Sequence, residues 1–238
     1  MKQLESILRN QTVVVIGGSS GIGAAVASEA AERGAHVYAV GRRAETSDAP
    51  HGIRHESVDL TDETSLRALF ERIGSVDHLV ITAGPSVAAR PLADSDLFQA
   101  QQAFEVKFWG ALRAIQTVLP HLSERGSVTL TSGLLSRKFV AGQFIKTTLN
   151  AALEALAKQL AKELAPRRVN VISPGVTDTE AYAGMDESLR TAMFARTSAA
   201  LPVGRVGTPQ DLAAAFMLVM ENGFISGSII DVDGGGLL

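Results

Sequence analysis

The fold is decided by the stretch Val13-Val14-Val15-Ile16-Gly17-Gly18-Ser19-Ser20-Gly21-Ile22-Gly23. The mostly β-branched run from Thr12 to Ile16 predicts a strand that is buried on both faces of a parallel sheet. Glycines in the spacing Gly-x3-Gly-x-Gly then allow a sharp turn and a close approach of the backbone to a bound group. Segment 24–33 predicts a helix whose free N–H groups favour an anion at that turn. The stretch therefore predicts a phosphate cradle for a dinucleotide, with an ordinary strand-to-helix turn as the alternative.

Composition limits the class of protein. The 238 residues are 46% hydrophobic and 20% charged, which predicts an ordered globular chain with a large core. The net charge of −3 gives no basic surface for nucleic acid, and the absence of cysteine excludes disulfides and thiolate nucleophiles. Residues 1–10 are too polar for a signal peptide, and no apolar run approaches the roughly 18–20 residues that span a membrane. We therefore expect a cytoplasmic protein that binds neither nucleic acid nor membrane.

No metal site is expected. The five histidines show no helical ligand pair, because two of them flank a glycine in a loop-like stretch and the others are scattered along the chain. They are His36, His51, His55, His78 and His121.

Strand-like and helix-like segments alternate along the whole chain without a linker or an internal repeat. Predicted strands cover 12–16, 36–40, 53–58, 78–82, 127–131, 169–172 and 228–232, and predicted helices cover 21–33, 62–72, 96–122, 144–165 and 209–221. Gly34 and Gly74 lie where helices should end, and Thr208 with Asp211 resembles a capping box. The pattern predicts one α/β domain over residues 1–238, with about seven mainly parallel strands in a doubly wound sheet and helices on both faces.

In such a sheet, ligands bind beyond the carboxyl ends of the strands. The segments that follow each strand are therefore the candidates for a site. Segment 180–200 lies between the last two predicted strands and is expected to act as a mobile lid over the site.

Several further motifs follow the glycine loop in a fixed order. They are Asp59-Leu60-Thr61-Asp62 after the third strand, Thr82-Ala83-Gly84 after the fourth, Ser132 after the fifth, Asn170 with Ser173-Pro174-Gly175-Val176-Thr177-Asp178-Thr179 at the sixth, and Leu201-Pro202-Val203-Gly204-Arg205 and Asp231-Val232-Asp233-Gly234-Gly235 near the end. Together they resemble the short-chain dehydrogenase/reductase family over nearly the whole chain. The resemblance implies a Rossmann-like fold and a nicotinamide cofactor. It also implies that the cofactor contacts Gly17, Ser19, Ser20, Gly21, Ile22, Gly23, Asp59, Leu60, Ala83, Gly84, Pro174, Gly175, Val176 and Thr179.

The segment after the second strand indicates which nicotinamide cofactor is bound. It reads Val40-Gly41-Arg42-Arg43, without the acid that would hydrogen-bond a ribose 2′-hydroxyl. An arginine can instead bind a 2′-phosphate through a charge-assisted fork. We therefore predict NADP(H), with Arg42 as the leading phosphate ligand and Arg43 as the second. The alternative is that both arginines are solvated loop residues, and Ser20 stands where many NADP-dependent relatives have a basic residue.

The catalytic residues depart from the family pattern. The family uses a tyrosine acid, a lysine four residues later, a serine that holds the substrate oxygen and an asparagine in the preceding helix. Here Lys146 falls at the tyrosine position, Asn150 at the lysine position and Lys107 at the asparagine position. The two tyrosines, Tyr38 and Tyr182, fall within a predicted strand and within the predicted lid.

An unusual active site can still be built from these residues. Positions 146 and 150 share a helix face, so Lys146, Asn150, Lys107 and Ser132 are expected to converge. Lys146 is a candidate acid, provided that its pKa falls from about 10.4 towards neutrality. Alternatively, Ser132 and Lys107 polarise a carbonyl while water supplies the proton. The simpler interpretations are a turn serine, two solvated lysines and a structural hydrogen bond at Asn150.

The sequence thus predicts an NADP(H)-dependent oxidoreductase that transfers hydride to a carbonyl or another polarised double bond of a small substrate. The alternative is a catalytically silent NADP(H)-binding sensor or partner subunit. The resemblance also implies a homo-oligomer, a dimer or tetramer. The small residues Ala151, Ala152 and Ala155 would allow close helix packing in it, and the alternative is that they pack closely against the sheet.

Overall fold

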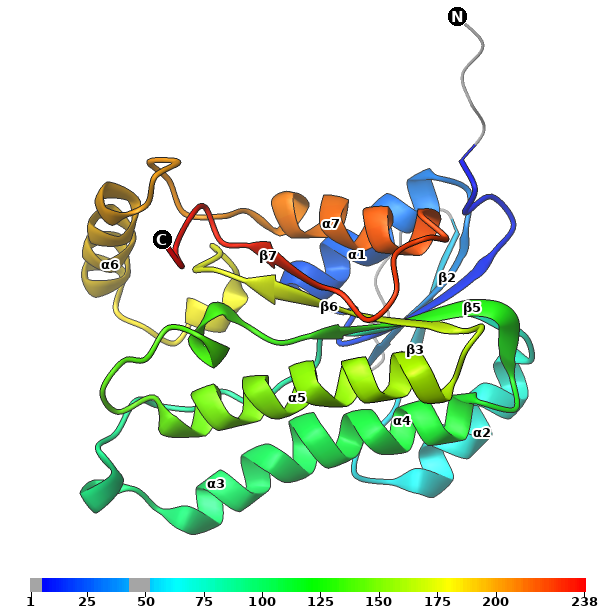
Figure 1. The fold of residues 1–238 in the computed structure, drawn as a ribbon, viewed down its shortest axis with the longest axis horizontal. Coiled ribbons are helices and arrows are strands. Elements are labelled where there is room, and N and C mark those ends of the chain that lie inside the picture. Colours follow the sequence, from blue (N-terminus) through cyan, green and yellow to red (C-terminus); the bar gives the residue numbers. More distant parts are fainter. Residues whose placement is uncertain (1–5, 43–51) are drawn as a thin grey trace, which may run out of the picture.

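A computed structural model describes residues 6–42 and 52–238 and contains a single seven-stranded sheet. All the strands pair in parallel, in the order β3-β2-β1-β4-β5-β6-β7, so the chain starts in the middle of the sheet and reverses direction once (Figure 1). The strands are β1 (Thr12–Ile16), β2 (His36–Gly41), β3 (Ile53–Ser57), β4 (Val76–Ile81), β5 (Leu122–Thr131), β6 (Arg168–Pro174) and β7 (Ile229–Val232). The predicted doubly wound α/β fold is therefore confirmed.

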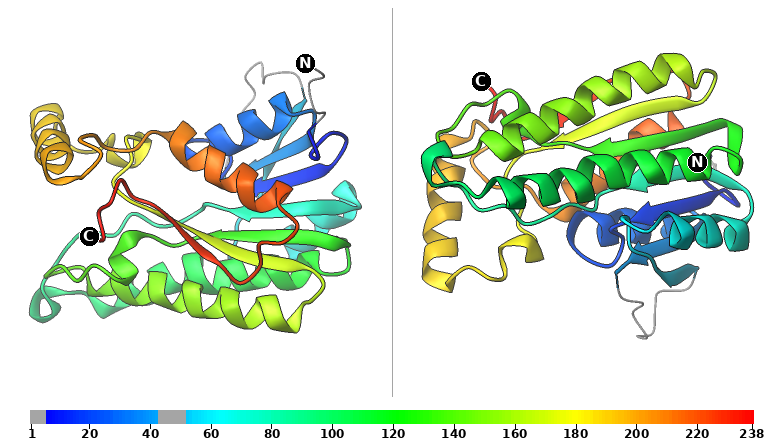
Figure 2. Two further views of the ribbon diagram at one scale, coloured as in Figure 1. Left: turned by 45° about the horizontal axis from the view of Figure 1, so that its top comes forward. Right: turned by 90° about the horizontal axis from the view of Figure 1, so that it is seen from below.

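Helices cover both faces of the sheet. Figures 1 and 2 show α1 and α7 on one face and α2, α3, α4 and α5 on the other. Each layer buries its own apolar cluster against the sheet, as expected for strands that are hydrophobic on both sides. The α-helices are α1 (Gly21–Glu32), α2 (Glu63–Ile73), α3 (Leu97–Phe104), α4 (Gly110–Val118), α5 (Phe144–Glu163), α6 (Glu187–Ala200) and α7 (Pro209–Glu221). Short helical turns occur at η1 (Leu92–Asp94), η3 (Leu134–Ser136) and η4 (Glu180–Tyr182).

The local signals for helix ends are confirmed. Gly34 and Gly74 follow α1 and α2 with positive φ angles of 85° and 79°, a conformation that glycine adopts without strain. At the start of α7, Thr208 and Asp211 form the reciprocal hydrogen bonds of a capping box.

The prediction of one continuous helix over 96–122 is wrong in two respects. A π-helical segment, η2 (Glu105–Trp109), separates α3 from α4, and the helical part ends at Val118. Leu122 already belongs to β5, where it pairs with Val76. The apolar periodicity of the sequence continues through the π-helical segment, so it does not reveal the extra residue in that turn. Such π-helical turns are often found at functional sites.

Segment 180–200 forms η4 and α6, which stand beyond the carboxyl ends of β6 and β7 (Figure 1). Helix α6 contains no buried residue, so few contacts hold it against the rest of the chain. In the part of the chain that the structure describes, no helix has both the length and the apolar character required to cross a membrane.

Candidate cofactor and active site

The glycine loop packs so closely that side chains cannot be added to it. A Cβ atom on Gly23 would lie 2.0 Å from the carbonyl oxygen of Gly17, and a Cβ on Gly17 would lie 2.5 Å from the hydroxyl of Thr82. The backbone N–H of Gly17 donates to the carbonyl of Val40 at 2.7 Å, which ties the loop to the end of β2. This close packing requires glycine and brings the start of α1 against the end of β1.

Thr82 has a role that the sequence did not reveal. Its hydroxyl lies 3.3 Å from the carbonyl oxygen of Ile16 and 3.2 Å from that of Gly17, so it connects β4 to the glycine loop. The family motif that Thr82-Ala83-Gly84 resembles has asparagine at this position. The hydroxyl contacts could not be inferred without knowing that β4 lies beside β1.

The first turn of α1 has no side-chain cap, and the Glu180 carboxylate lies beside it, 3.4 Å from where a Cβ on Gly21 would be. Ser20 is the N-cap residue but makes no side-chain capping bond, and the first turn contains no acidic residue. Ser19 and Ile22 are partly buried beside it. Thr179, from the loop after β6, approaches the same turn, since a Cβ on Gly21 would lie 3.4 Å from its Cβ atom. The structure thus brings together predicted cofactor residues that are about 160 positions apart in the chain.

Arg42 lies just beyond β2 with its side chain exposed. Its carbonyl accepts a hydrogen bond from Ser57 at 3.1 Å. The N–H and hydroxyl of Thr61 both donate to Asp59 at 2.8 Å and lower the pKa of this carboxyl group, and the charge of Arg42 contributes a smaller effect in the same direction. Arg43 lies outside the described residues.

The other predicted cofactor residues follow the ends of β3, β4 and β6. Leu60 is buried, and Ala83 and Gly84 continue from β4. Gly175 donates to the carbonyl of Val232 at 3.0 Å and leaves no room for a side chain against Asp233. Pro174 ends β6, and the carbonyl of Val176 accepts from Gly207 at 2.9 Å.

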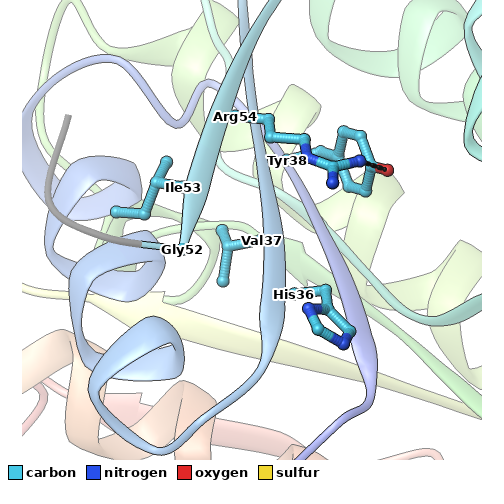
Figure 3. Close-up of a pocket in the computed structure, with 6 residues that line it drawn as sticks. All are labelled: His36, Val37, Tyr38, Gly52, Ile53 and Arg54. Atoms are coloured by element: carbon cyan, nitrogen blue, oxygen red, sulfur yellow. Dashed lines mark hydrogen bonds between the residues drawn. The ribbon is translucent and has the colours of Figure 1, made fainter. Parts of the chain in front are cut away.

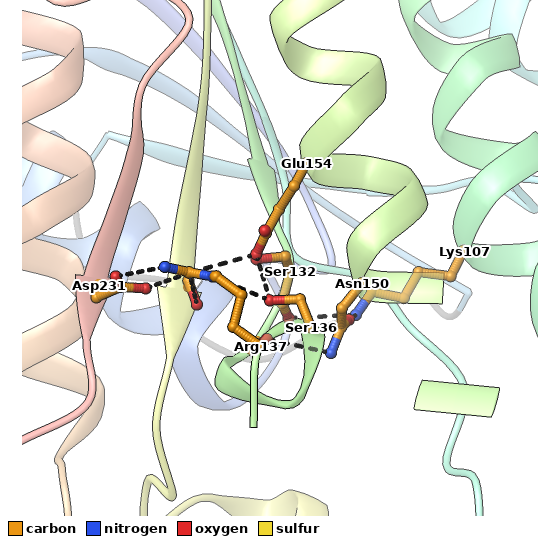
Figure 4. A network of polar contacts seen from close by, with 9 residues as sticks. Lys107, Ser132, Ser136, Arg137, Asn150, Glu154 and Asp231 are labelled. Atoms are coloured by element: carbon orange, nitrogen blue, oxygen red, sulfur yellow. Dashed lines mark hydrogen bonds and ion pairs between the residues drawn. The ribbon is translucent and has the colours of Figure 1, made fainter. Parts of the chain in front are cut away.

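Lys107 and Asn150 form a direct pair (Figure 4). The Lys107 ammonium, in the π-helical segment, donates to the side-chain oxygen of Asn150 at 2.8 Å and to the backbone carbonyl of Ser132 at 3.4 Å. The aliphatic part of Lys107 lies over Gly84, where an added Cβ would come within 3.4 Å. Burial, and secondarily the charge of Lys146, lower the pKa of Lys107 from 10.5 to about 8.

Lys146 lies in the first turn of α5, one helical turn before Asn150. It is partly buried, and this burial lowers the pKa of its ammonium group. Among the described residues, none forms a hydrogen bond or an ion pair with Lys146, although its charge acts on Lys107. A cation in the first turn also opposes the helix dipole.

The hydroxyl of Ser132 points to a group that the sequence reading did not include. It donates to the buried carboxylate of Glu154 at 2.9 Å, and Ser136 donates to the same oxygen at 2.6 Å. Arg137 lies 3.4 Å from this oxygen and forms a two-pronged ion pair with Asp231 (Figure 4). The only available sequence signal was a glutamate on the apolar side of α5, one turn after Asn150.

Both tyrosines have contacts elsewhere. Tyr38 accepts a hydrogen bond from Arg54 at 2.8 Å in a shallow cavity of about 250 Å³ beside β2 and β3 (Figure 3). Tyr182 packs edge-on against Phe194 of α6, with ring centres 5.4 Å apart. A larger cavity of about 650 Å³ is lined in part by Val106 and Ile145, the chain neighbours of Lys107 and Lys146.

Three comparisons agree with this architecture. Residues 16–236 match a family model described as enoyl-(acyl carrier protein) reductase. A short-chain dehydrogenase/reductase, ATR9, from Stachybotrys chlorohalonatus is 32% identical, with 97% of this chain and 98% of that protein covered. A cis-4-hydroxycyclohexanecarboxylate dehydrogenase from Sinomonas cyclohexanicum is 33% identical, with 94% and 96% covered. A crystal structure of a small-chain dehydrogenase in complex with NADPH is 44% identical with a TM-score of 0.85, with 96% of this chain and 99% of that chain covered.

The parallel sheet and the glycine loop at its point of reversal define a doubly wound α/β protein of the class that binds dinucleotides. Its relatives are named as dehydrogenases and reductases, which makes the chain an oxidoreductase by class. The chain belongs to the short-chain dehydrogenase/reductase family.

Proposed function

We propose that this protein is an NADP(H)-dependent oxidoreductase that reduces a carbonyl, or another polarised double bond, of a small substrate. The observation that carries the proposal is the glycine loop, in which a Cβ on Gly23 would lie 2.0 Å from the Gly17 carbonyl oxygen. Such packing brings the N-terminus of α1 close to the end of β1, the arrangement in which a helix N-terminus can approach a pyrophosphate. The related structure with bound NADPH supports the same cofactor.

Preference for NADP(H) over NAD(H) is assigned to Arg42. It is exposed beyond the end of β2 and forms no ion pair with any described residue, so its guanidinium is available to a phosphate. Arg43 is proposed as a second phosphate ligand. Asp59 and Leu60 would contact the adenine side, while Val176 and Thr179 would contact the nicotinamide end.

The proposed catalytic group lacks the family's tyrosine–lysine pair. Its members are Lys107, Asn150, Lys146 and Ser132, of which the first two are joined directly. The family's lysine and asparagine have in effect exchanged helices, because an amide from α5 now faces an ammonium from the π-helical segment. With this exchange the site keeps a positive charge, on Lys107, and a neutral hydrogen-bond partner for it, Asn150.

When bound, the cofactor supplies the hydride. Lys107 would stabilise the negative charge that develops on the substrate oxygen, and Asn150 would hold the Lys107 ammonium in place. The Lys146 ammonium donates to no residue that the structure describes and has a lowered pKa, so it can donate the proton that this oxygen takes up. The Ser132 hydroxyl is directed to Glu154, so the role proposed for Ser132 is to position its backbone carbonyl against Lys107.

The remaining sequence expectations are also proposed. Residues 1–238 would form one domain, and η4 with α6 would act as a lid over the substrate. A homo-oligomer is compatible with α5, because Ala151 and Ala155 lie exposed on its outer face and leave room for a second helix.

Binding of the reduced cofactors tests the proposal. Arg42→Ala is expected to weaken NADPH binding about tenfold or more, since a charge-assisted hydrogen bond contributes roughly 1.5–3 kcal/mol, while NADH binding changes little. Cofactor fluorescence and calorimetry give both dissociation constants, and Arg125→Ala, at the opposite end of the sheet, is the control. Equal binding of NADPH and NADH by the unaltered protein would remove the NADP(H) assignment. Cofactor binding without turnover of any carbonyl or enone substrate would refute the proposed oxidoreductase activity.

A further inference from the structure

Two lysines at the proposed active site have no carboxylate partner in residues 6–42 and 52–238. Lys107 comes from the π-helical segment and Lys146 from the start of α5, one turn before the Asn150 to which Lys107 donates, and the charge of Lys146 contributes to the lowered pKa of Lys107. Lys107 donates only to neutral carbonyl oxygens, those of Asn150 and Ser132. Lys146 donates to no described residue. A partly buried cation is costly unless it is paired, and here two such cations are placed together.

The acidic groups nearby in the fold are already committed to other partners. Glu154, on α5, accepts from Ser132 and Ser136 and faces Arg137. Glu105, in the same helical segment as Lys107, pairs with Arg113. Asp231 pairs with Arg137. None of these carboxylates forms an ion pair with either lysine, so the part of the chain that the structure describes does not supply the neutralising charge.

The electrostatic consequences support this description. Burial and the neighbouring ammonium lower the pKa of Lys107 to about 8, and burial lowers that of Lys146. A neighbouring carboxylate would shift both pKa values in the opposite direction. Among the described residues the site therefore holds excess positive charge at neutral pH, and the N–H groups of Lys146 donate to none of them.

We propose that Lys107 and Lys146 bind the anionic group of the substrate, so that this oxidoreductase acts on short oxo-carboxylates and the corresponding hydroxy-carboxylates. Lys107 donates to Asn150, and Lys146 lies one helical turn before Asn150, so both lysines lie beside the same amide. Lys146 would hold the carboxylate while Lys107 polarises a carbonyl one to three carbons away. For these substrates the cofactor hydride goes to the carbonyl carbon, and water, rather than Lys146, gives the carbonyl oxygen its proton. The inference rests on the proposed function for its redox step. The binding of the anion does not depend on that step.

Matched pairs of ligands isolate the charge. Pyruvate, acetoacetate and 4-oxopentanoate are compared with their methyl esters, first for binding to the cofactor-free protein by calorimetry and lysine NMR. At least one carboxylate is expected to bind more tightly than its ester and to raise the pKa of Lys107 from about 8. Lys146→Met should weaken the binding of that carboxylate about tenfold and the binding of its ester less than twofold, because a hydrogen bond to a charged group contributes roughly 1.5–3 kcal/mol.

Two variants serve as controls. Lys146→Arg keeps the charge and should keep the preference for the carboxylate, whereas Lys158→Met removes an exposed lysine from the same helix and should change nothing. Equal binding of acids and esters, or carboxylate binding that is indifferent to Lys146→Met, would overturn the inference. If Lys146→Met instead weakens only the binding of NADPH, the anion that Lys146 binds is a phosphate of the cofactor, and the inference is also overturned. Selective carboxylate binding without turnover would uphold the anion site and count against the oxidoreductase.

Discussion

Replacing Lys107 by methionine is expected to change the stability of the protein in a strongly pH-dependent way. Folding lowers the pKa of Lys107 from 10.5 to about 8, and each pKa unit corresponds to about 1.4 kcal/mol. At pH 7 the ammonium is charged in both the folded and the unfolded chain, so the folded state bears a cost of about 3 kcal/mol. Methionine has a similar length and removes this cost.

The hydrogen bond to Asn150 acts in the opposite direction. Its loss leaves a buried amide oxygen without a donor, which costs about 1–3 kcal/mol. At pH 7 we therefore expect Lys107→Met to have the same free energy of unfolding as the unaltered protein or up to about 2 kcal/mol more. The same substitution should abolish most reductase activity, as expected where a destabilised group serves function.

The pH dependence is the decisive measurement, because the hydrogen-bond contribution largely cancels. As pH rises from 7 to 10, the folded ammonium of the unaltered protein loses its proton while the unfolded chain remains largely protonated. The unaltered protein therefore gains about 2–2.5 kcal/mol relative to Lys107→Met over this range. Urea unfolding followed by circular dichroism at the two pH values gives the difference, with Lys158→Met as an exposed control. A constant difference between the two proteins would refute the lowered pKa of Lys107 and the electrostatic role built on it.

Two further predictions concern the cofactor loop and the sheet. Gly23→Ala should weaken NADPH binding at least tenfold in calorimetry and lower the free energy of unfolding by about 1–3 kcal/mol, because the new methyl group would overlap the Gly17 carbonyl; unchanged binding would contradict the tight loop. His78 is buried between Ser127 and Gln11, and burial lowers its pKa from 6.5 to about 4. The unfolded chain thus binds a proton below pH 6.5 that the folded chain takes up only near pH 4, so stability is lost as pH falls through this window. Between pH 7 and pH 4.5 this loss should amount to about 2–3 kcal/mol and be absent from His78→Gln in urea unfolding; equal losses in both proteins would assign it to other groups.

The sequence by itself determined the sheet and the cofactor loop. The β-branched run at Thr12–Ile16 and the glycines after it are local signals, since burial on both faces selects the residue type of a strand and a tight turn selects glycine. The capping box at Thr208 and the stops at Gly34 and Gly74 are equally local, because each depends on hydrogen bonds or φ angles within a few residues.

Only the tertiary structure decided how the polar groups of the site are paired. Lys107 and Asn150 are 43 positions apart, and their contact depends on how two helices pack against one sheet. In the same packing the Ser132 hydroxyl donates to Glu154 and Arg137 pairs with Asp231. Lys146 has no partner among the described residues. The sign of each side-chain charge can be read from a sequence. Whether that charge is neutralised depends on residues that are far apart in the chain and that the fold brings into contact. The sequence thus specified the glycine loop and two unusual lysines, and the fold decided that Lys107 donates to Asn150 while no described residue accepts from Lys146.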